Sequence, residues 1–382
     1  MKFFHLSDLH IGLRLMDRDL CEDQKYILKQ VVLAAQREKP DGIVIAGDIY
    51  DKPVPSAEAV EIFDSFITGL AGIPGMAIMS VGGNHDSGQR VNCFRNVLSR
   101  QGMYMVGMPP QREGEYIEKV TLEDAFGRVN FYLLPFVRPS MVRQIVGTDG
   151  DGNSLSYNDT IQKLIAREKI DSRERNVLVS HQFYLPVGKV AEEVERMDSE
   201  IRTVGNIDQV SAEVLACFDY AALGHIHKPM KAGRENWRYC GTPLACSVSE
   251  AGQQKGILMV EMGEKGEAVK TTALPLEPLR RVCVVKGKLE EVLRQPSGDY
   301  VTVILTDKVD LDVADMQDRL RAAFPYLLEI RRENARRADY GRKAKREALL
   351  DPFALCCSFL KETDSREREI LKDVINTVRE AK

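Results

Sequence analysis

The chain lacks the signatures of several common protein classes. Its eight cysteines include no CxxC pair, which argues against a zinc ribbon or a disulfide framework and favours reduced thiols. It has no GxxxxGK[ST] phosphate-binding loop, so any dependence on ATP must come from a partner, and no GxSxG nucleophile elbow. No apolar stretch is long enough to span a bilayer, and the first motif lies too near residue 1 for a signal peptide to precede it. We therefore expect a cytoplasmic protein with no membrane partner.

Charge of one sign is also scarce. The net charge is −4 over 382 residues, so the chain has no overall basic field, and any binding of nucleic acid must use local basic patches. The composition, 44% hydrophobic and 29% charged, is that of a soluble globular protein. The length predicts two or three domains.

Five short apolar runs, each bounded by turn residues, predict strands at residues 2–6, 42–46, 76–81, 176–180 and 220–223. Helical patterns lie between several of them, for example at Glu58–Leu70 and Asn158–Glu168, which favours an α/β sandwich. Ligands of such sheets bind beyond the carboxyl ends of the strands. Each of these five ends carries metal-binding side chains, and together they present Asp8, His10, Asp48, Asn84, His85, His181, His225 and His227.

The chain has only six histidines, and five of them lie at these strand ends. His225 and His227 alone could form a polar turn, because short histidine spacings are common by chance. The whole set, with Asp8 and Asp48 among it, favours a metal cluster instead. His5 lies inside the first strand and is interpreted as a structural residue or as one that supports a ligand. Gly47, Gly82, Gly83 and Gly224 precede candidate ligands, where a side chain would hinder a sharp turn or a close approach of the backbone.

Mixed imidazole and carboxylate ligands suit manganese, iron or zinc better than calcium. Seven candidate ligands are too many for one tetrahedral site but fit two metals that share a carboxylate, an arrangement that cleaves phosphate esters. His85 lies beside a ligand and could donate a proton to the leaving oxygen or stabilise its charge.

The pattern DxH, GD, GNHD, H and GHxH across residues 8–227 resembles the calcineurin-like metallophosphoesterases. The resemblance implies a four-layer β-sandwich flanked by helices. By position, it makes Asp8, His10 and His227 ligands of a first metal, and Asn84, His181 and His225 ligands of a second. Asp48 would bridge the two metals, and His85 would be the catalytic histidine.

Within this superfamily, the stretches "GDIYDKPVPS", "DSEIRTVGNIDQV" and "YCGTPLACSVSE" resemble the SbcD-like nuclease subunits of bacterial double-strand-break processing complexes. Tyr50 departs from the phenylalanine that is usual in the GD motif. The resemblance implies two Mn²⁺ ions, exonuclease action on duplex DNA ends, and endonuclease action on single strands and hairpins, in DNA repair, recombination and replication. It also implies an SbcC-type ATPase as partner, a homodimer within a heterotetramer, and a location at the nucleoid. The dimer would form through helices at about Ala57–Leu70 and Val91–Arg100.

The last third of the chain predicts a separate module. Residues 274–281 contain two prolines and indicate a linker. The segments that follow it predict a small α+β module, with strands at Val282–Lys286, Tyr300–Thr306 and Leu327–Arg331 and helices at Leu289–Arg294 and Val313–Phe324. This module resembles the capping domain of the family, which contacts DNA.

Beyond the module, residues 329–347 hold eight basic and four acidic side chains, which indicates either a solvated segment or a surface for DNA or an acidic partner. Residues 351–360 and 366–381 then predict two amphipathic helices, the second with an apolar stripe of Ile370, Leu371, Val374, Ile375 and Val378. By resemblance they bind the SbcC coiled coil. The predicted domains are therefore residues 1–276 (nuclease), 277–333 (cap) and 334–382 (linker and helices).

Two other functions share the same metal core: a phosphatase or other dimetal phosphodiesterase, and a non-catalytic scaffold. The module and the C-terminal helices argue against the first. The complete ligand set argues against the second, because decayed relatives lose ligands.

Overall fold

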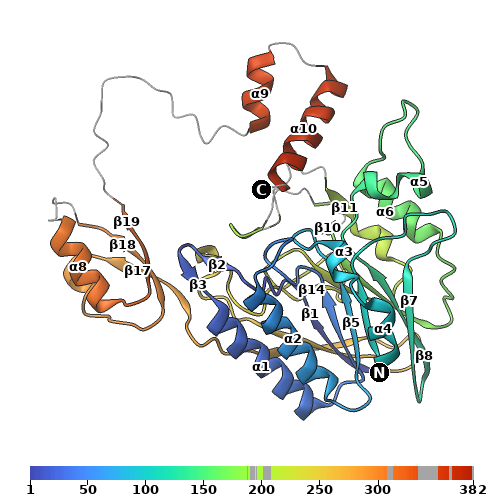
Figure 1. The fold of residues 1–382 in the computed structure, drawn as a ribbon, viewed down its shortest axis with the longest axis horizontal. Helices are drawn as coiled ribbons and strands as arrows, with labels where there is room; N and C mark the ends of the chain where they lie inside the picture. The colour runs from blue at the N-terminus through green and yellow to red at the C-terminus, as the bar shows by residue number, and fades with distance from the viewer. Residues whose placement is uncertain are drawn as a thin grey trace.

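The structure is a computed structural model of the chain. It describes residues 1–186, 188–189, 194, 196–200, 208–307, 313–333, 352–360 and 364–380. Figure 1 shows a layered body, a small module beside it, and two helices near the C-terminus.

Among the described residues, two six-stranded sheets form the body. The first has the strand order β16-β15-β1-β4-β5-β6. Its strands are β1 (Lys2–Leu6), β4 (Gly42–Ala46), β5 (Ala77–Val81), β6 (Met103–Val106), β15 (Gly256–Glu261) and β16 (Lys270–Pro275). Strands β1, β4, β5 and β6 run parallel, whereas β15 is antiparallel to both of its neighbours.

The second sheet has the order β13-β14-β12-β9-β8-β7. Its strands are β7 (Glu118–Asp124), β8 (Gly127–Leu134), β9 (Arg175–His181), β12 (Tyr220–Gly224), β13 (Met230–Lys231) and β14 (Trp237–Tyr239). The four central strands are parallel, and the two edge strands are antiparallel to their neighbours. All five strands predicted from the sequence are therefore present, each within one or two residues of its expected bounds.

The two sheets pack face to face, with helices on both outer surfaces. Successive residues of β1 show the layering: Phe3 packs between the sheets, whereas Phe4 packs against the outer helices. Helices α1 (Cys21–Glu38) and α2 (Ala57–Ala71) cover the first sheet, and α6 (Tyr157–Ala166) covers the second. Because both faces of the central strands are buried, those strands are apolar throughout, as is usual for parallel sheets. The predicted four-layer α/β sandwich is confirmed.

Shorter elements complete the body. They are the hairpin β2 (Arg14–Leu15) and β3 (Arg18–Asp19), the pair β10 (Phe183–Leu185) and β11 (Gln209–Ser211), and helix α5 (Arg143–Val146).

The predicted helix at Val91–Arg100 is wrong. Helix α3 (Gly88–Val91) ends early, and α4 (Arg95–Leu98) begins only after Phe94. Phe94 has a φ of 59°, in the left-handed region that an α-helix of L-residues cannot continue through. The predicted helix at Glu58–Leu70, by contrast, is confirmed as α2.

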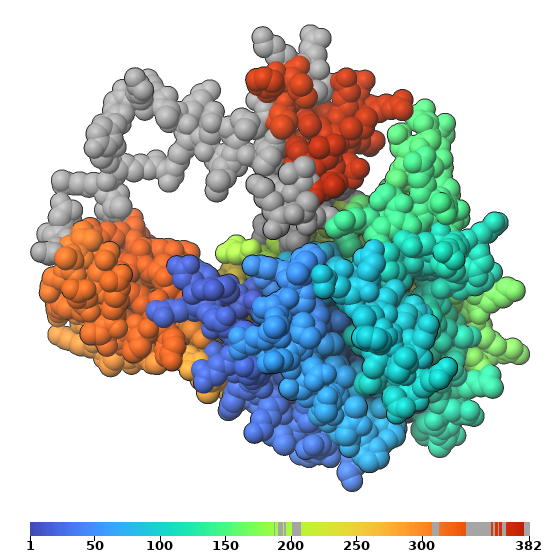
Figure 2. All heavy atoms as spheres, viewed as in Figure 1, coloured from blue at the N-terminus to red at the C-terminus, as the bar shows by residue number. Residues whose placement is uncertain are grey.

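The small module contains a three-stranded parallel sheet in the order β17-β18-β19. Its elements are β17 (Val282–Gly287), α7 (Leu289–Val292), β18 (Tyr300–Leu305), α8 (Val313–Ala323) and β19 (Leu327–Arg332). It has a core of its own, but Val282 and Tyr300 pack into the core of the body. The predicted element order is confirmed, whereas Leu274 and Pro275 belong to β16 rather than to the linker. Figure 2 shows the module (orange) against the N-terminal part of the body (blue).

The C-terminal helices α9 (Pro352–Leu360) and α10 (Ser365–Glu380) contact each other. On α10, the side chains of Ile370 and Val374 are 54% and 52% exposed. The side chain of Val378 and most of the basic segment lie outside the described residues. In the part of the chain that the structure describes, no helix combines the length and the apolar character needed to cross a membrane.

His5 joins the two sheets and is fully buried. Its Nδ1 lies 3.1 Å from the hydroxyl of Tyr220, and its Nε2 lies 3.2 Å from the carbonyl oxygen of Leu223, both on β12. Burial lowers the pKa of His5 to about 3. Its role is therefore structural, one of the two alternatives expected from the sequence.

We predict that His5 makes the fold sensitive to acid. Below pH 6.5 the unfolded chain protonates this side chain and the folded chain does not, so the free energy of unfolding falls as the pH falls toward 3. Between pH 7.5 and 5.5, the wild-type chain should lose about 1.4 kcal/mol more than His5→Gln, which cannot titrate. Urea denaturation at the two pH values measures this difference, and equal losses in the two proteins would contradict the prediction.

Candidate metal centre

The residues predicted as ligands stand on unusual backbone. Among the described residues, seven non-glycine residues have a positive φ, and four of them are Asp8 (53°), His10 (41°), Asp48 (48°) and His225 (98°). Such conformations cost on the order of 1–3 kcal/mol each and persist where function requires them. The loops that follow β1, β4 and β12 are therefore held in these conformations by the surrounding structure.

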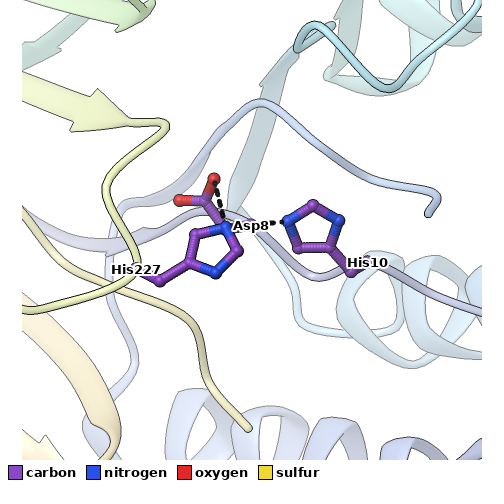
Figure 3. Close-up of side chains that lie close together, drawn as sticks. All are labelled: Asp8, His10 and His227. Atoms are coloured by element: carbon purple, nitrogen blue, oxygen red, sulfur yellow. Dashed lines mark hydrogen bonds and ion pairs between the residues drawn. The ribbon is translucent and has the colours of Figure 1, made fainter. Parts of the chain in front are cut away.

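Asp8, His10 and His227 form one group of side chains (Figure 3). Nε2 of His10 lies 3.1 Å from Nε2 of His227, and Oδ1 of Asp8 lies 4.0 Å from the same His227 atom. All three are buried, and Nδ1 of His10 has no hydrogen-bond partner. Burial lowers the pKa of His10 well below its usual value, so its ring is neutral and carries a lone pair. Two ring nitrogens that face each other beside a carboxylate are suited to holding a cation.

Asn84, His181 and His225 form a second group. Oδ1 of Asn84 lies 2.9 Å from Nε2 of His181 and 3.0 Å from Nδ1 of His225. The two rings meet edge to face, with their centroids 5.3 Å apart. Loops from both sheets meet here, because Asn84 follows β5, whereas His181 ends β9 and His225 follows β12.

Asp48 lies between the two groups. Its Oδ2 is 3.3 Å from Nε2 of His181 and 3.6 Å from Nε2 of His10, which belong to different groups. Its Oδ1 accepts a hydrogen bond of 2.9 Å from the backbone N–H of His85. Burial acts to raise the pKa of this carboxyl, but the imidazoles of His181 and His85 outweigh burial and hold the pKa well below its usual value. A single ionised carboxylate therefore faces both groups.

His85 is at the rim of the site, where its side chain is 17% exposed. Its Nδ1 lies 2.9 Å from the carbonyl oxygen of Asp51, which can only accept a hydrogen bond, so the proton is on Nδ1. The other ring nitrogen, Nε2, lies 4.0 Å from Oδ2 of Asp48. His85 is thus oriented toward the site by its backbone neighbour rather than by a second imidazole.

Three of the four glycines picked out from the sequence make room for this site. A Cβ atom on Gly47 would lie 2.2 Å from the ring of His181, and one on Gly83 would lie 2.1 Å from the carboxylate of Asp48. On Gly224 it would lie 1.8 Å from the carbonyl oxygen of Ala46. Gly82 differs, because its nearest neighbour is the backbone of Gly107 at 3.3 Å.

Asp86, which was not predicted from the sequence as a site residue, holds two ligand loops together. Its carboxylate accepts hydrogen bonds from the backbone N–H groups of Ile49, Tyr50 and Gly83, at 2.8–3.0 Å. Burial, and then the charge of Asp48, raises the pKa of Asp86 to about 6. Its signal in the sequence was the last letter of the GNHD motif.

A buried polar network behind His227 was not predicted either. Ser199 Oγ lies 2.7 Å from Nδ1 of His227 and donates a 2.8 Å hydrogen bond to Glu250, which also accepts from Lys255 at 2.6 Å. Glu200 accepts a hydrogen bond from the backbone N–H of His227 at 3.0 Å. Carboxylates behind a histidine orient its ring and raise its basicity. These residues lie in the stretches that carry the SbcD-like resemblance, but no spacing in the sequence places them against His227.

All eight predicted site residues therefore come together at one edge of the two sheets, where strands from both sheets end. The donor set, with two carboxylates, an amide oxygen and imidazoles that have free nitrogens, fits divalent cations of the manganese, iron and zinc type.

Comparison with known proteins gives matches over most of the chain. Residues 1–229 match the calcineurin-like phosphoesterase family, and residues 275–364 match the type 5 capsule protein repressor C-terminal domain. A solved structure of a dimetal phosphatase from Danio rerio has a TM-score of 0.39 and 15% identity, covering 72% of this chain and 98% of that one.

Two curated relatives are named as the SbcD component of the nuclease SbcCD. The protein from Staphylococcus epidermidis is 30% identical over 337 residues, which cover 86% of this chain and 85% of that protein. The protein from Staphylococcus saprophyticus is 30% identical over 298 residues, covering 77% and 74%. The chain belongs to the SbcD family of calcineurin-like phosphoesterases.

Proposed function

We propose that this chain is the nuclease subunit of an SbcCD-type complex and hydrolyses DNA phosphodiester bonds with two divalent metal ions, Mn²⁺ in the cell. The observation that carries the proposal is the position of Asp48, whose carboxylate faces His10 on one side and His181 on the other. The substrates would be duplex ends, hairpins and single strands, in DNA repair, recombination and replication. The names of the two relatives support both the nuclease activity and the ATPase partner.

The residues divide into holders and a proton donor. Asp8, His10 and His227 would hold one ion, and Asn84, His181 and His225 the other, with Asp48 shared. When bound, such a pair supplies hydroxide and neutralises charge on a phosphate that undergoes in-line displacement. His85 keeps its proton on Nδ1 and turns Nε2 toward the site, where a protonated ring can donate to the leaving oxygen or stabilise its charge.

We also propose a division of labour along the chain: residues 1–276 cleave DNA, residues 277–333 cap and contact it, and residues 334–382 bind the ATPase. The separate core of the small module supports the middle assignment. The protein would act in the cytoplasm, at the nucleoid.

The first prediction separates binding of metal from chemistry. Asp48→Asn should lose tight binding of both Mn²⁺ ions, because the shared carboxylate lowers the repulsion between them. His85→Ala is the matched variant: it should keep both ions and lower turnover by about 10²–10⁴-fold. Calorimetric Mn²⁺ titration and cleavage of a labelled hairpin measure the two effects. Two tightly bound ions in Asp48→Asn, or parallel loss of metal and activity in His85→Ala, would contradict these roles.

A second prediction concerns the homodimer. Phe94 is 74% exposed and Val97 is 63% exposed, close together at the start of α4. Two such side chains on one surface suit a contact with a second copy of the chain. Light scattering at micromolar concentration should find a dimer in the wild-type chain and a monomer in Phe94→Ser/Val97→Ser. Leu33→Ser, which removes a 53% exposed side chain on α1, is the control and should stay dimeric.

The third prediction concerns the ATPase partner. Ile370 and Val374 lie one helical turn apart on α10 and are both about half exposed, so a partner helix could bury them. Ile370→Glu/Val374→Glu should weaken binding to an SbcC-type ATPase by about tenfold or more per side chain. Mn²⁺-dependent cleavage of single strands should persist, both in this variant and after truncation at Lys345.

Glu369→Ala, which changes an exposed polar residue of the same helix, is the matched control and should bind normally. Co-purification of the truncated chain with the ATPase, or loss of its basal cleavage, would assign these helices to the body instead.

A further inference from the structure

The first turn of α1 touches both the small module and the loop that carries His10. Glu22, Asp23 and Gln24 are consecutive in this turn. Glu22 and Asp23 contact the module, whereas Gln24 contacts the loop between Leu9 and Gly12. Two parts of the molecule that are far apart in the sequence therefore meet at adjacent residues of one helix.

Gln24 holds the backbone around His10 on two sides. Its side chain is buried, and its Nε2 donates a hydrogen bond of 2.7 Å to the carbonyl oxygen of His10. Its Oε1 accepts a hydrogen bond of 2.9 Å from the backbone N–H of Gly12. Because His10 has the left-handed φ of 41°, its backbone is costly to hold, and this amide fixes the carbonyl of the strained residue.

Asp23 anchors the module beside this clamp. Its Oδ2 accepts hydrogen bonds of 2.7 Å from the hydroxyl of Tyr300 and 2.9 Å from Nη1 of Arg280. Asp23 is 1% exposed, and its Oδ1 is buried without a hydrogen-bond partner. The same guanidinium donates to Glu22 at 2.8 Å and lies 4.5 Å from the ring centre of Tyr326. A buried carboxylate with only one oxygen satisfied depends on these two module side chains for its compensation.

We propose that Gln24 is a positioning residue for His10, and that the contact of Asp23 with Tyr300 and Arg280 makes this positioning depend on how the small module is seated. The proposal rests on the proposed role of His10 as a metal ligand. A shift of the module moves Asp23, and the helix carries Gln24 with it because the two residues share one turn. The loop from Leu9 to Gly12, and with it the ring of His10, then changes its position. Seating of the module is thereby coupled to metal affinity.

A second contact between α1 and the module side provides the control. Nε2 of Gln30 donates to the carbonyl oxygen of Glu277 at 2.6 Å, and Oε1 of Gln30 accepts from the N–H of Glu277 at 3.2 Å. Gln30 lies about two turns further along α1, away from the loop that carries His10. Gln30→Leu therefore loosens the connection without touching the first turn.

The experiment compares the full-length wild-type chain with Tyr300→Phe, Gln24→Leu and Gln30→Leu. Hydrogen exchange of the metal-free proteins, followed on peptides that cover residues 8–15, measures the positioning of the loop. Calorimetric titration with Mn²⁺ alone measures the affinity of the site. Tyr300→Phe removes one hydroxyl from the module and leaves the core packing in place.

Both Gln24→Leu and Tyr300→Phe should speed exchange in residues 8–15. Gln24→Leu should weaken Mn²⁺ binding by about tenfold, the lower end of the effect of removing a residue that supports a ligand. Tyr300→Phe should weaken it by roughly threefold, as expected for one lost hydrogen bond that acts at a distance. In the double variant, Tyr300→Phe should add little to Gln24→Leu, because both act through one path. Gln30→Leu should change neither measurement.

The coupling is wrong if Tyr300→Phe changes exchange only in the module and in α1, or if Gln30→Leu has the same effect on residues 8–15. A wild-type chain that binds no Mn²⁺ would overturn the proposed function instead. In that case the exchange measurement still decides whether the module and the loop are coupled.

Discussion

The site is organised around the carboxylate of Asp48. One oxygen is occupied by the N–H of His85, and the other faces His181 and His10 from a buried position. This geometry requires a left-handed residue directly after β4, preceded by Gly47, whose missing Cβ leaves space for the ring of His181. It also requires Gly83, because any side chain there would occupy the place of the carboxylate. The ends of β4, β5 and β9 are thus shaped by one ionised group.

The fold and the ligand set were predictable from the sequence because both depend on local patterns. The apolar run Gly42–Ala46, followed by Gly47 and Asp48, reports a strand, its end and a ligand together. Parallel pairing then brings such ends to one edge, so His181 and Gly224 lie level on neighbouring strands. Rarity helped as well, since five of only six histidines lie at strand ends.

The supporting residues could not be predicted in the same way, because their roles come from contacts over long sequence distances. Glu250 reaches the neighbourhood of His227 only through the packing of the two sheets, and Gln24 looks in the sequence like an ordinary polar residue of an amphipathic helix. Phe94 shows the opposite failure. Its apolar neighbours have a helical spacing, but its left-handed backbone divides the segment into two short helices. Local propensity is a weak guide wherever tertiary contacts fix the backbone.

The small module is not an independent bead on a linker, and this affects how it can act on the body. It has its own core, yet Tyr300 also packs among body residues and places its hydroxyl on the buried carboxylate of Asp23. Swinging the module away would leave that carboxylate buried without compensation, or would expose apolar surface, and both changes are unfavourable. Small changes of seating are therefore favoured over wide opening. Because the first turn of α1 lies between the module and the loop that carries His10, such small changes act on the site without any direct contact between the module and a ligand.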